Sequence, residues 1–173
     1  MINTLVFLSI RVLHVLLAGT WIGVAVFVAM FLAPVVDDLG PAGGSVMVGL
    51  ARRGMTTFVP IVAGMTILSG VWLYWRFTGG FDPAISRTPS GLAFGVGGAF
   101  GLMAAIIGGA VINRGGKRLM TLAAQTSTMR DGPEKAALLV TIAALRRQVA
   151  FAGRVVVVLL TITLTLMAIG HYV

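Results

Sequence analysis

With 173 residues, of which 58% are hydrophobic and only 10% charged, the chain is far more apolar than a soluble domain, in which about a quarter of the residues are charged. Its formal net charge of +8 would favour a nucleic-acid partner in a soluble protein, but here the basic residues lie mostly between apolar runs, where they set membrane orientation, so we expect no nucleic-acid partner. The absence of cysteine excludes disulfides, thiolate metal sites and thiol redox chemistry.

Four apolar runs are long enough to cross a bilayer, which takes about 20 residues. The first run lies within Leu5–Val36, and we expect its hydrocarbon span to extend from Leu13 to Pro34. The other three runs cover Thr57–Trp75, Leu92–Ile112 and Val155–Tyr172. The sequence therefore predicts an all-α, four-transmembrane-helix bundle, with residues 1–173 forming a single integral membrane domain.

Lysine and arginine are divided unequally between the two sides of this bundle. The connections between runs one and two and between runs three and four, with their flanks, carry ten of the 13 basic residues. The other side carries three, Arg11, Arg76 and Arg87. Because basic loops stay on the cytoplasmic side, we expect those two connections in the cytoplasm and both termini outside. The expected location is a bacterial-type inner (cytoplasmic) membrane.

The connection between the third and fourth runs has helical features of its own. Asp131-Gly132-Pro133-Glu134 resembles a capping box with Asp131 as the N-cap. The preceding segment Lys117–Met129 lacks glycine and proline. We expect the last two transmembrane helices to extend into the cytoplasm as a hairpin that turns near Gly132. Such a hairpin could dock a membrane protein partner or a second copy in a homo-oligomer, or its basic amphipathic face could lie on lipid headgroups.

Glycines at four-residue spacing predict close helix contacts. The pairs are Gly19 with Gly23, Gly91 with Gly95, and Gly97 with Gly101. The glycine-rich third run could accept another helix or a flat cofactor along its small-residue face.

His14 is an ionisable residue inside the first apolar run, and such residues mark functional sites in membranes. The only other histidine is His171. With both termini on one side, the two imidazoles would lie within roughly one turn of the same membrane boundary. A bis-histidine site for haem b needs only these two ligands. Arg11, on the same helix face as His14, could pair with a haem propionate or act as an interfacial anchor, and Trp21 extends that face as a cofactor contact or as packing.

Copper is the competing cofactor. Met167 and His171 are four residues apart on one helix face, and a thioether together with imidazole suits Cu(I), with His14 as a third ligand. A purely structural interpretation is also open, in which His14 bonds a helix carbonyl or a threonine and His171 is a solvated residue near the C-terminus.

All five acidic residues lie in connections. The sequence therefore gives no support to a carboxylate proton relay across the membrane, and it carries no motif of hydrolytic enzymes.

The segment from Arg11 to Pro34 resembles the first helix of the copper-resistance-D-like integral membrane proteins. Its distinctive elements are Leu13-His14, Trp21-Ile22-Gly23 and Leu32-Ala33-Pro34, and the similar features further on are Arg52-Arg53, Ser69-Gly70 and Asn113-Arg114. The chain also resembles, more distantly, the membrane protoporphyrinogen oxidase type, and this resemblance implies that His14 is a haem ligand.

Together these features predict a membrane protein for electron transfer or metal handling that binds haem b or copper at an outer-leaflet site. The alternative from the sequence is a non-catalytic scaffold or assembly subunit of a larger membrane complex. Neither hypothesis decides whether the protein is an enzyme.

Overall fold

The computed structural model describes residues 2–173, with the side chains of Ile2, Asn3 and Pro41 excepted. Over this range the chain forms helices and no strand. Four helices are long and apolar enough to cross a membrane, which agrees with the four runs predicted and makes this a multi-pass membrane protein by length and composition.

The first membrane helix is longer than predicted and contains a π-helical segment. It runs without a break through α1 (Ile2–Phe27), η1 (Val28–Leu32) and α2 (Ala33–Asp38). The wider π turn directly precedes Pro34, which has no N–H and whose ring crowds the carbonyl of the preceding turn. A π segment next to a proline lets the helix continue to Asp38, where the sequence predicted an end near Val36.

The connection to the second membrane helix forms a helix that the sequence did not reveal, α3 (Pro41–Arg52). It folds back against α2 at Gly43, where an added Cβ would collide with the carbonyl group of Val36. The second membrane helix, α4 (Met55–Phe77), begins after Gly54, whose φ of +86° suits glycine alone.

The third membrane helix also continues far beyond its apolar run. A short helix, α5 (Pro83–Ser86), leads to α6 (Pro89–Ile107), whose first turn is capped by the Thr88 hydroxyl accepting from the Gly91 N–H at 3.1 Å. From α6 the chain continues through the π-helical η2 (Gly108–Asn113) into α7 (Arg114–Thr128).

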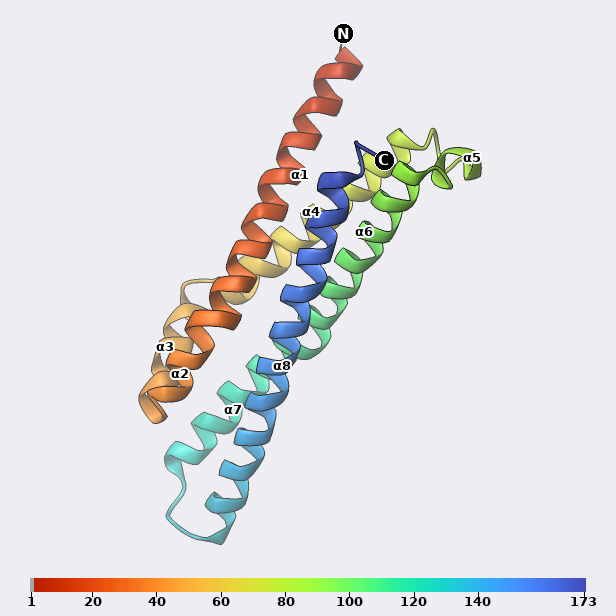
Figure 1. Cartoon of the computed structure of the whole chain (residues 1–173). Coiled ribbons are helices and arrows are strands. Elements are labelled where there is room, and N and C mark those ends of the chain that lie inside the picture. Colours follow the sequence, from red (N-terminus) through yellow and green to blue (C-terminus); the bar gives the residue numbers. More distant parts are fainter. Residues whose placement is uncertain (1) are drawn as a thin grey trace.

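The last helix, α8 (Pro133–Ile169), has 37 residues and is therefore about 55 Å long, well beyond the roughly 30 Å of bilayer hydrocarbon. Its first half packs along α7 and its second half along α6, so α7 and α8 form an antiparallel pair (Figure 1). Gly115 of α7 makes this contact close, because an added Cβ would lie 2.6 Å from the side chain of Val149.

The predicted capping box at the start of this helix is wrong. The N-cap is Gly132, no side chain caps the helix, and Pro133 occupies its first turn. Asp131 lies one residue too early to reach the free N–H groups, and its carboxylate instead pairs with Lys135 at 2.7 Å. That lysine lowers the pKa of the Asp131 carboxyl below its usual value of 3.8, by hydrogen bonding and by charge attraction.

The core lies where four membrane helices meet. Its buried members come from α1, α4, α6 and α8: Trp21, Val62, Ala63, Ala104, Val156 and Leu160. Both termini and α5 lie at one end of the bundle, while α2, α3 and the α7–α8 turn lie toward the other (Figure 1). The ten basic residues of the two predicted cytoplasmic connections therefore gather toward that second end.

The small-residue face of α6 is filled by another helix. An added Cβ on Gly97 would lie 3.2 Å from Leu166 Cβ and 3.3 Å from Met167 Cε, both on α8. Gly101 faces Thr163 of the same helix at 3.6 Å. At Gly97 and Gly101 these contacts agree with helix packing, one of the two uses predicted for this face.

Candidate functional site

His14 is held against α4 by two hydrogen bonds to one ring nitrogen. Its Nδ1 lies 3.0 Å from the carbonyl oxygen of Thr66 and 3.0 Å from the hydroxyl oxygen of Ser69. A carbonyl can only accept, so Nδ1 carries a proton and donates it to α4. The Ser69 hydroxyl has acceptors of its own, the carbonyls of Met65 at 2.7 Å and of Thr66 at 3.0 Å, so it too uses its proton within α4.

Gly70 provides the surface on which the imidazole rests. An added Cβ there would lie 2.9 Å from Cε1 and 3.5 Å from Nδ1 of His14. A contact at 2.9 Å is closer than real Cβ atoms approach, so any side chain at this position would displace the ring. The close packing of α1 on α4 at this level therefore depends on glycine.

The second ring nitrogen of His14, Nε2, lies 3.7 Å from the position of an added Cβ on Gly70. Nε2 has no hydrogen-bond partner in the described part of the chain. In the same part, every fully buried polar side-chain atom has a partner, so an atom without one is not fully buried. Nε2 is therefore accessible, which agrees with the half-buried position of the residue. A neutral imidazole with Nδ1 protonated presents a lone pair at Nε2, the arrangement of a metal-binding histidine.

Arg11 and His171 lie together at the end of the bundle that carries both termini. The Arg11 Nη2 donates to His171 Nε2 at 2.8 Å, joining α1 to the turn that follows α8. The imidazole of His171 also packs edge-on against Phe94, with ring centroids 5.0 Å apart. Because Arg11 uses the acceptor nitrogen of His171, that nitrogen is not directed at a shared ligand with His14.

Trp21 and Met167 occupy packing positions. Trp21 is 6% exposed and belongs to the core described above. Met167 directs its Cε toward Gly97 of α6, whereas His14 lies against α4. The structure therefore brings Arg11 and His171 together, and the partners it gives to His14, His171 and Met167 are different: α4, Arg11 and Gly97 of α6.

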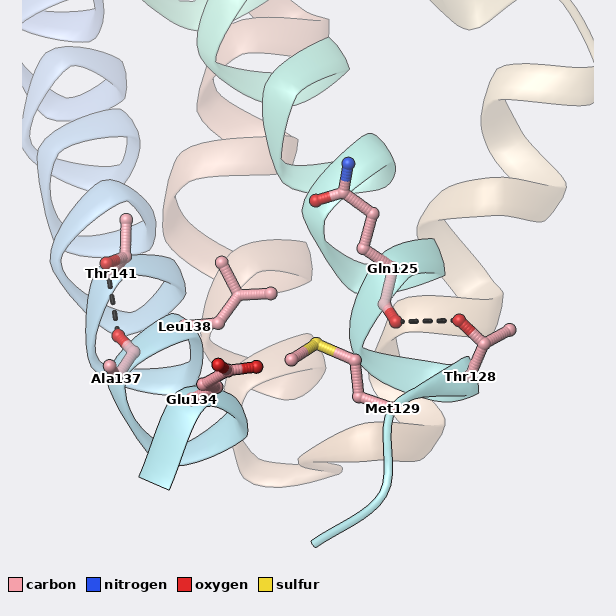
Figure 2. Close-up of a pocket in the computed structure, with 7 residues that line it drawn as sticks. All are labelled: Gln125, Thr128, Met129, Glu134, Ala137, Leu138 and Thr141. Carbon is pink, nitrogen blue, oxygen red and sulfur yellow. Dashed lines mark hydrogen bonds between the residues drawn. The ribbon is translucent and has the colours of Figure 1, made fainter. Parts of the chain in front are cut away.

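One hollow lies elsewhere, in the gap between the end of α7 and the start of α8 (Figure 2). It measures about 720 Å³, and Met129 and Glu134 reach into it from the two sides. It contains no histidine and lies at the opposite end of the molecule from the Arg11–His171 bond. Residues 2–173 hold no cluster of three or more His, Asp or Glu side chains suited to a metal ion.

Comparison with protein-family models, with curated proteins and with solved structures found no match. The resemblance to copper-resistance-D-like proteins and to the protoporphyrinogen oxidase type therefore stays a hypothesis from the sequence.

The sequence did not predict which residues contact His14. Ser69 and Gly70 are part of the family resemblance but were not expected next to His14, and Thr66 was not expected there either. The available signal was the pair Ser69-Gly70, which places a hydroxyl next to a position without a side chain on one helix. The interpretation that His14 bonds a helix carbonyl agrees with the structure.

Proposed function

We propose that this protein binds haem b through Nε2 of His14 and acts in membrane electron transfer. The observation that carries the proposal is the orientation of the imidazole, with Nδ1 bonded to Thr66 and Ser69 of α4 and Nε2 without a partner in the described chain. When Nδ1 of a ligand histidine donates a hydrogen bond to a carbonyl, that bond fixes the tautomer and makes Nε2 a more basic ligand atom.

The residues present fit a group held by a single protein imidazole better than a bis-histidine or copper site. His171 offers no free acceptor nitrogen while Arg11 bonds it, and Met167 faces α6. When bound, haem b supplies one-electron redox chemistry whose potential depends on its axial ligand and on the polarity around it.

Arg11 lies one helical turn before His14, about 4.5 Å along the axis. A guanidinium has five N–H donors, so the bond to His171 leaves others for a haem propionate. Thr66, Ser69 and Gly70 hold the imidazole in place, and the core around Trp21 closes the bundle below it.

For the orientation, we propose that both termini and His14 lie toward the outer side of a bacterial-type inner membrane and that the α7–α8 hairpin projects into the cytoplasm. The support is the gathering of ten basic residues toward the hairpin end, together with the length of α8.

The test is a cofactor analysis of the protein purified in detergent from cells supplied with haem. We expect about one haem per chain in the wild type and in His171→Ala, and a loss of haem in His14→Ala. A colourless protein with one copper per chain would refute the haem proposal in favour of copper. A colourless, metal-free wild type would refute both cofactors.

The second candidate is a scaffold or assembly subunit, alone or as a homo-oligomer. The observation that favours it is the exposure of the first membrane helix, which buries a smaller share of its apolar part than the other three. On this helix Gly19 and Gly23 have no atom within 4 Å of an added Cβ. Cross-linking in native membranes distinguishes this candidate from the haem proposal, because an assembly subunit is recovered with a partner whether or not it carries haem.

A further inference from the structure

Three arginines line a hollow at the hairpin end, remote from His14. Arg146, Arg147 and Arg154 of α8 surround it, and Asp37 at the end of α2 completes it across the gap. The hollow measures about 510 Å³, within the usual range of small-ligand pockets. Three positive charges against one negative leave a net charge of +2 on its lining.

The spacing of these residues explains the hollow. Arg146, Ala150 and Arg154 recur at four-residue intervals along one side of α8, and Arg147, three residues before Ala150, lies beside them. Ala150 has too small a side chain to fill the space between the arginines. The two ends of this face are about 12 Å apart, eight residues at 1.5 Å each.

The arginines have no acidic partner that would neutralise them. Within the described chain the one ion pair within 4 Å joins Lys135 to Asp131, so Asp37 does not reach any guanidinium of the hollow. Arg147 and Arg154 are exposed and Arg146 is half-buried. Guanidinium groups that line one hollow without an acidic partner are suited to a phosphate, which they bind by paired hydrogen bonds.

The apolar part of the lining points to a lipid as the source of that phosphate. Phe151 lines the same hollow and is 69% exposed. Directly after Arg154 the helix becomes a continuous apolar run, so the hollow lies where polar helix meets membrane-spanning helix. A ligand there would meet positive charge on one side and hydrocarbon on the other.

We infer that this hollow is a binding site for an anionic phospholipid, with the headgroup phosphate on Arg146, Arg147 and Arg154 and an acyl chain along Phe151. Basic pockets between membrane helices are known to bind such headgroups. The site is independent of haem binding at His14.

The experiment measures thermal unfolding of the full-length protein in detergent with added phosphatidylglycerol, phosphatidylcholine or inorganic phosphate. We expect phosphatidylglycerol alone to raise the unfolding midpoint. The triple variant Arg146→Gln/Arg147→Gln/Arg154→Gln should bind it about 100-fold more weakly, at about fivefold for each arginine. The control Arg76→Gln/Arg87→Gln/Arg130→Gln removes the same charge outside the hollow and should bind as the wild type does.

Asp37→Asn gives a test whose expected result is tighter lipid binding, which a loss of folding would not produce. Removing the single negative charge of the hollow should tighten phosphatidylglycerol binding by about fivefold. The inference is overturned if the two triple variants bind equally, if phosphatidylcholine stabilises as strongly, or if inorganic phosphate alone reproduces the shift. Stabilisation by an acidic peptide without any by phosphatidylglycerol would also overturn it.

Discussion

Replacement of Gly70 by alanine is the sharpest perturbation of the His14 site, because it removes no atom of the proposed ligand and changes only its support. The new Cβ would lie 2.9 Å from Cε1 and 3.7 Å from Nε2 of His14, so the ring must move away from α4. That movement breaks the bond from Nδ1 to the carbonyl of Thr66. The matched control is Gly64→Ala on the same helix, where nothing lies within 4 Å of the added Cβ.

The magnitude follows from three contributions. A lost hydrogen bond costs about 1 kcal/mol. Overpacking costs about 1–3 kcal/mol. Alanine in a helix interior is favoured over glycine by about 1 kcal/mol. Gly70→Ala should therefore destabilise the protein by about 1–3 kcal/mol, whereas Gly64→Ala should be neutral or stabilising by up to about 1 kcal/mol.

The assay is unfolding in mixed micelles of a mild detergent and SDS, followed by tryptophan fluorescence. Haem affinity measured on the same two variants should fall by about 10–100-fold in Gly70→Ala, as is usual when the hydrogen-bonding support of a ligand is lost, and stay unchanged in Gly64→Ala. If Gly70→Ala is as stable as Gly64→Ala and binds haem equally well, the ring does not rest on α4 as described.

Three further predictions concern the packing, the chain ends and the hairpin. Gly97→Ala should destabilise the protein by about 1–3 kcal/mol in the same assay, because its Cβ would lie 3.2 Å from α8, whereas Gly101→Ala, at 3.6 Å, should not; equal effects would contradict the close α6–α8 contact. Arg11→Gln should cost less than about 1 kcal/mol because its bond to His171 is exposed, yet increase hydrogen exchange after α8; unchanged exchange would show that this bond does not hold the C-terminal turn. The carboxyl of Asp131, whose pKa the lysine one turn later lowers, should stabilise the hairpin above pH 3.8 and cease to do so as the pH falls through the lowered pKa; a carboxyl titration by NMR at or above 3.8 would refute this pairing.

The membrane helices could be predicted from the sequence because their apolar runs are long and uninterrupted. The ends of these helices could not be predicted, since α8 begins more than 20 residues before its apolar run and the first helix does not end at Pro34. A π segment accommodates Pro34, and no simple periodicity signals it. The helix α3 was missed because its glycine content argues against a helix, and contact with α2 at Gly43 overrides that preference.

At the site, His14 could be predicted because an ionisable side chain in an apolar run is conspicuous. Its partners could not, since Thr66 binds through a backbone carbonyl, a group that every residue carries. The bond between Arg11 and His171 depends on the two chain ends meeting, which the sequence predicted only as a shared depth.

The central claim is that Nε2 of His14 is the ligand atom, and the most direct measurement is the absorption spectrum of the apoprotein titrated with haem. We predict a Soret band that saturates at about one haem per chain in the wild type, that persists in His171→Ala and that is absent in His14→Ala. A wild-type protein that gives no saturable band, or a His14→Ala variant that gives the same band, would contradict it.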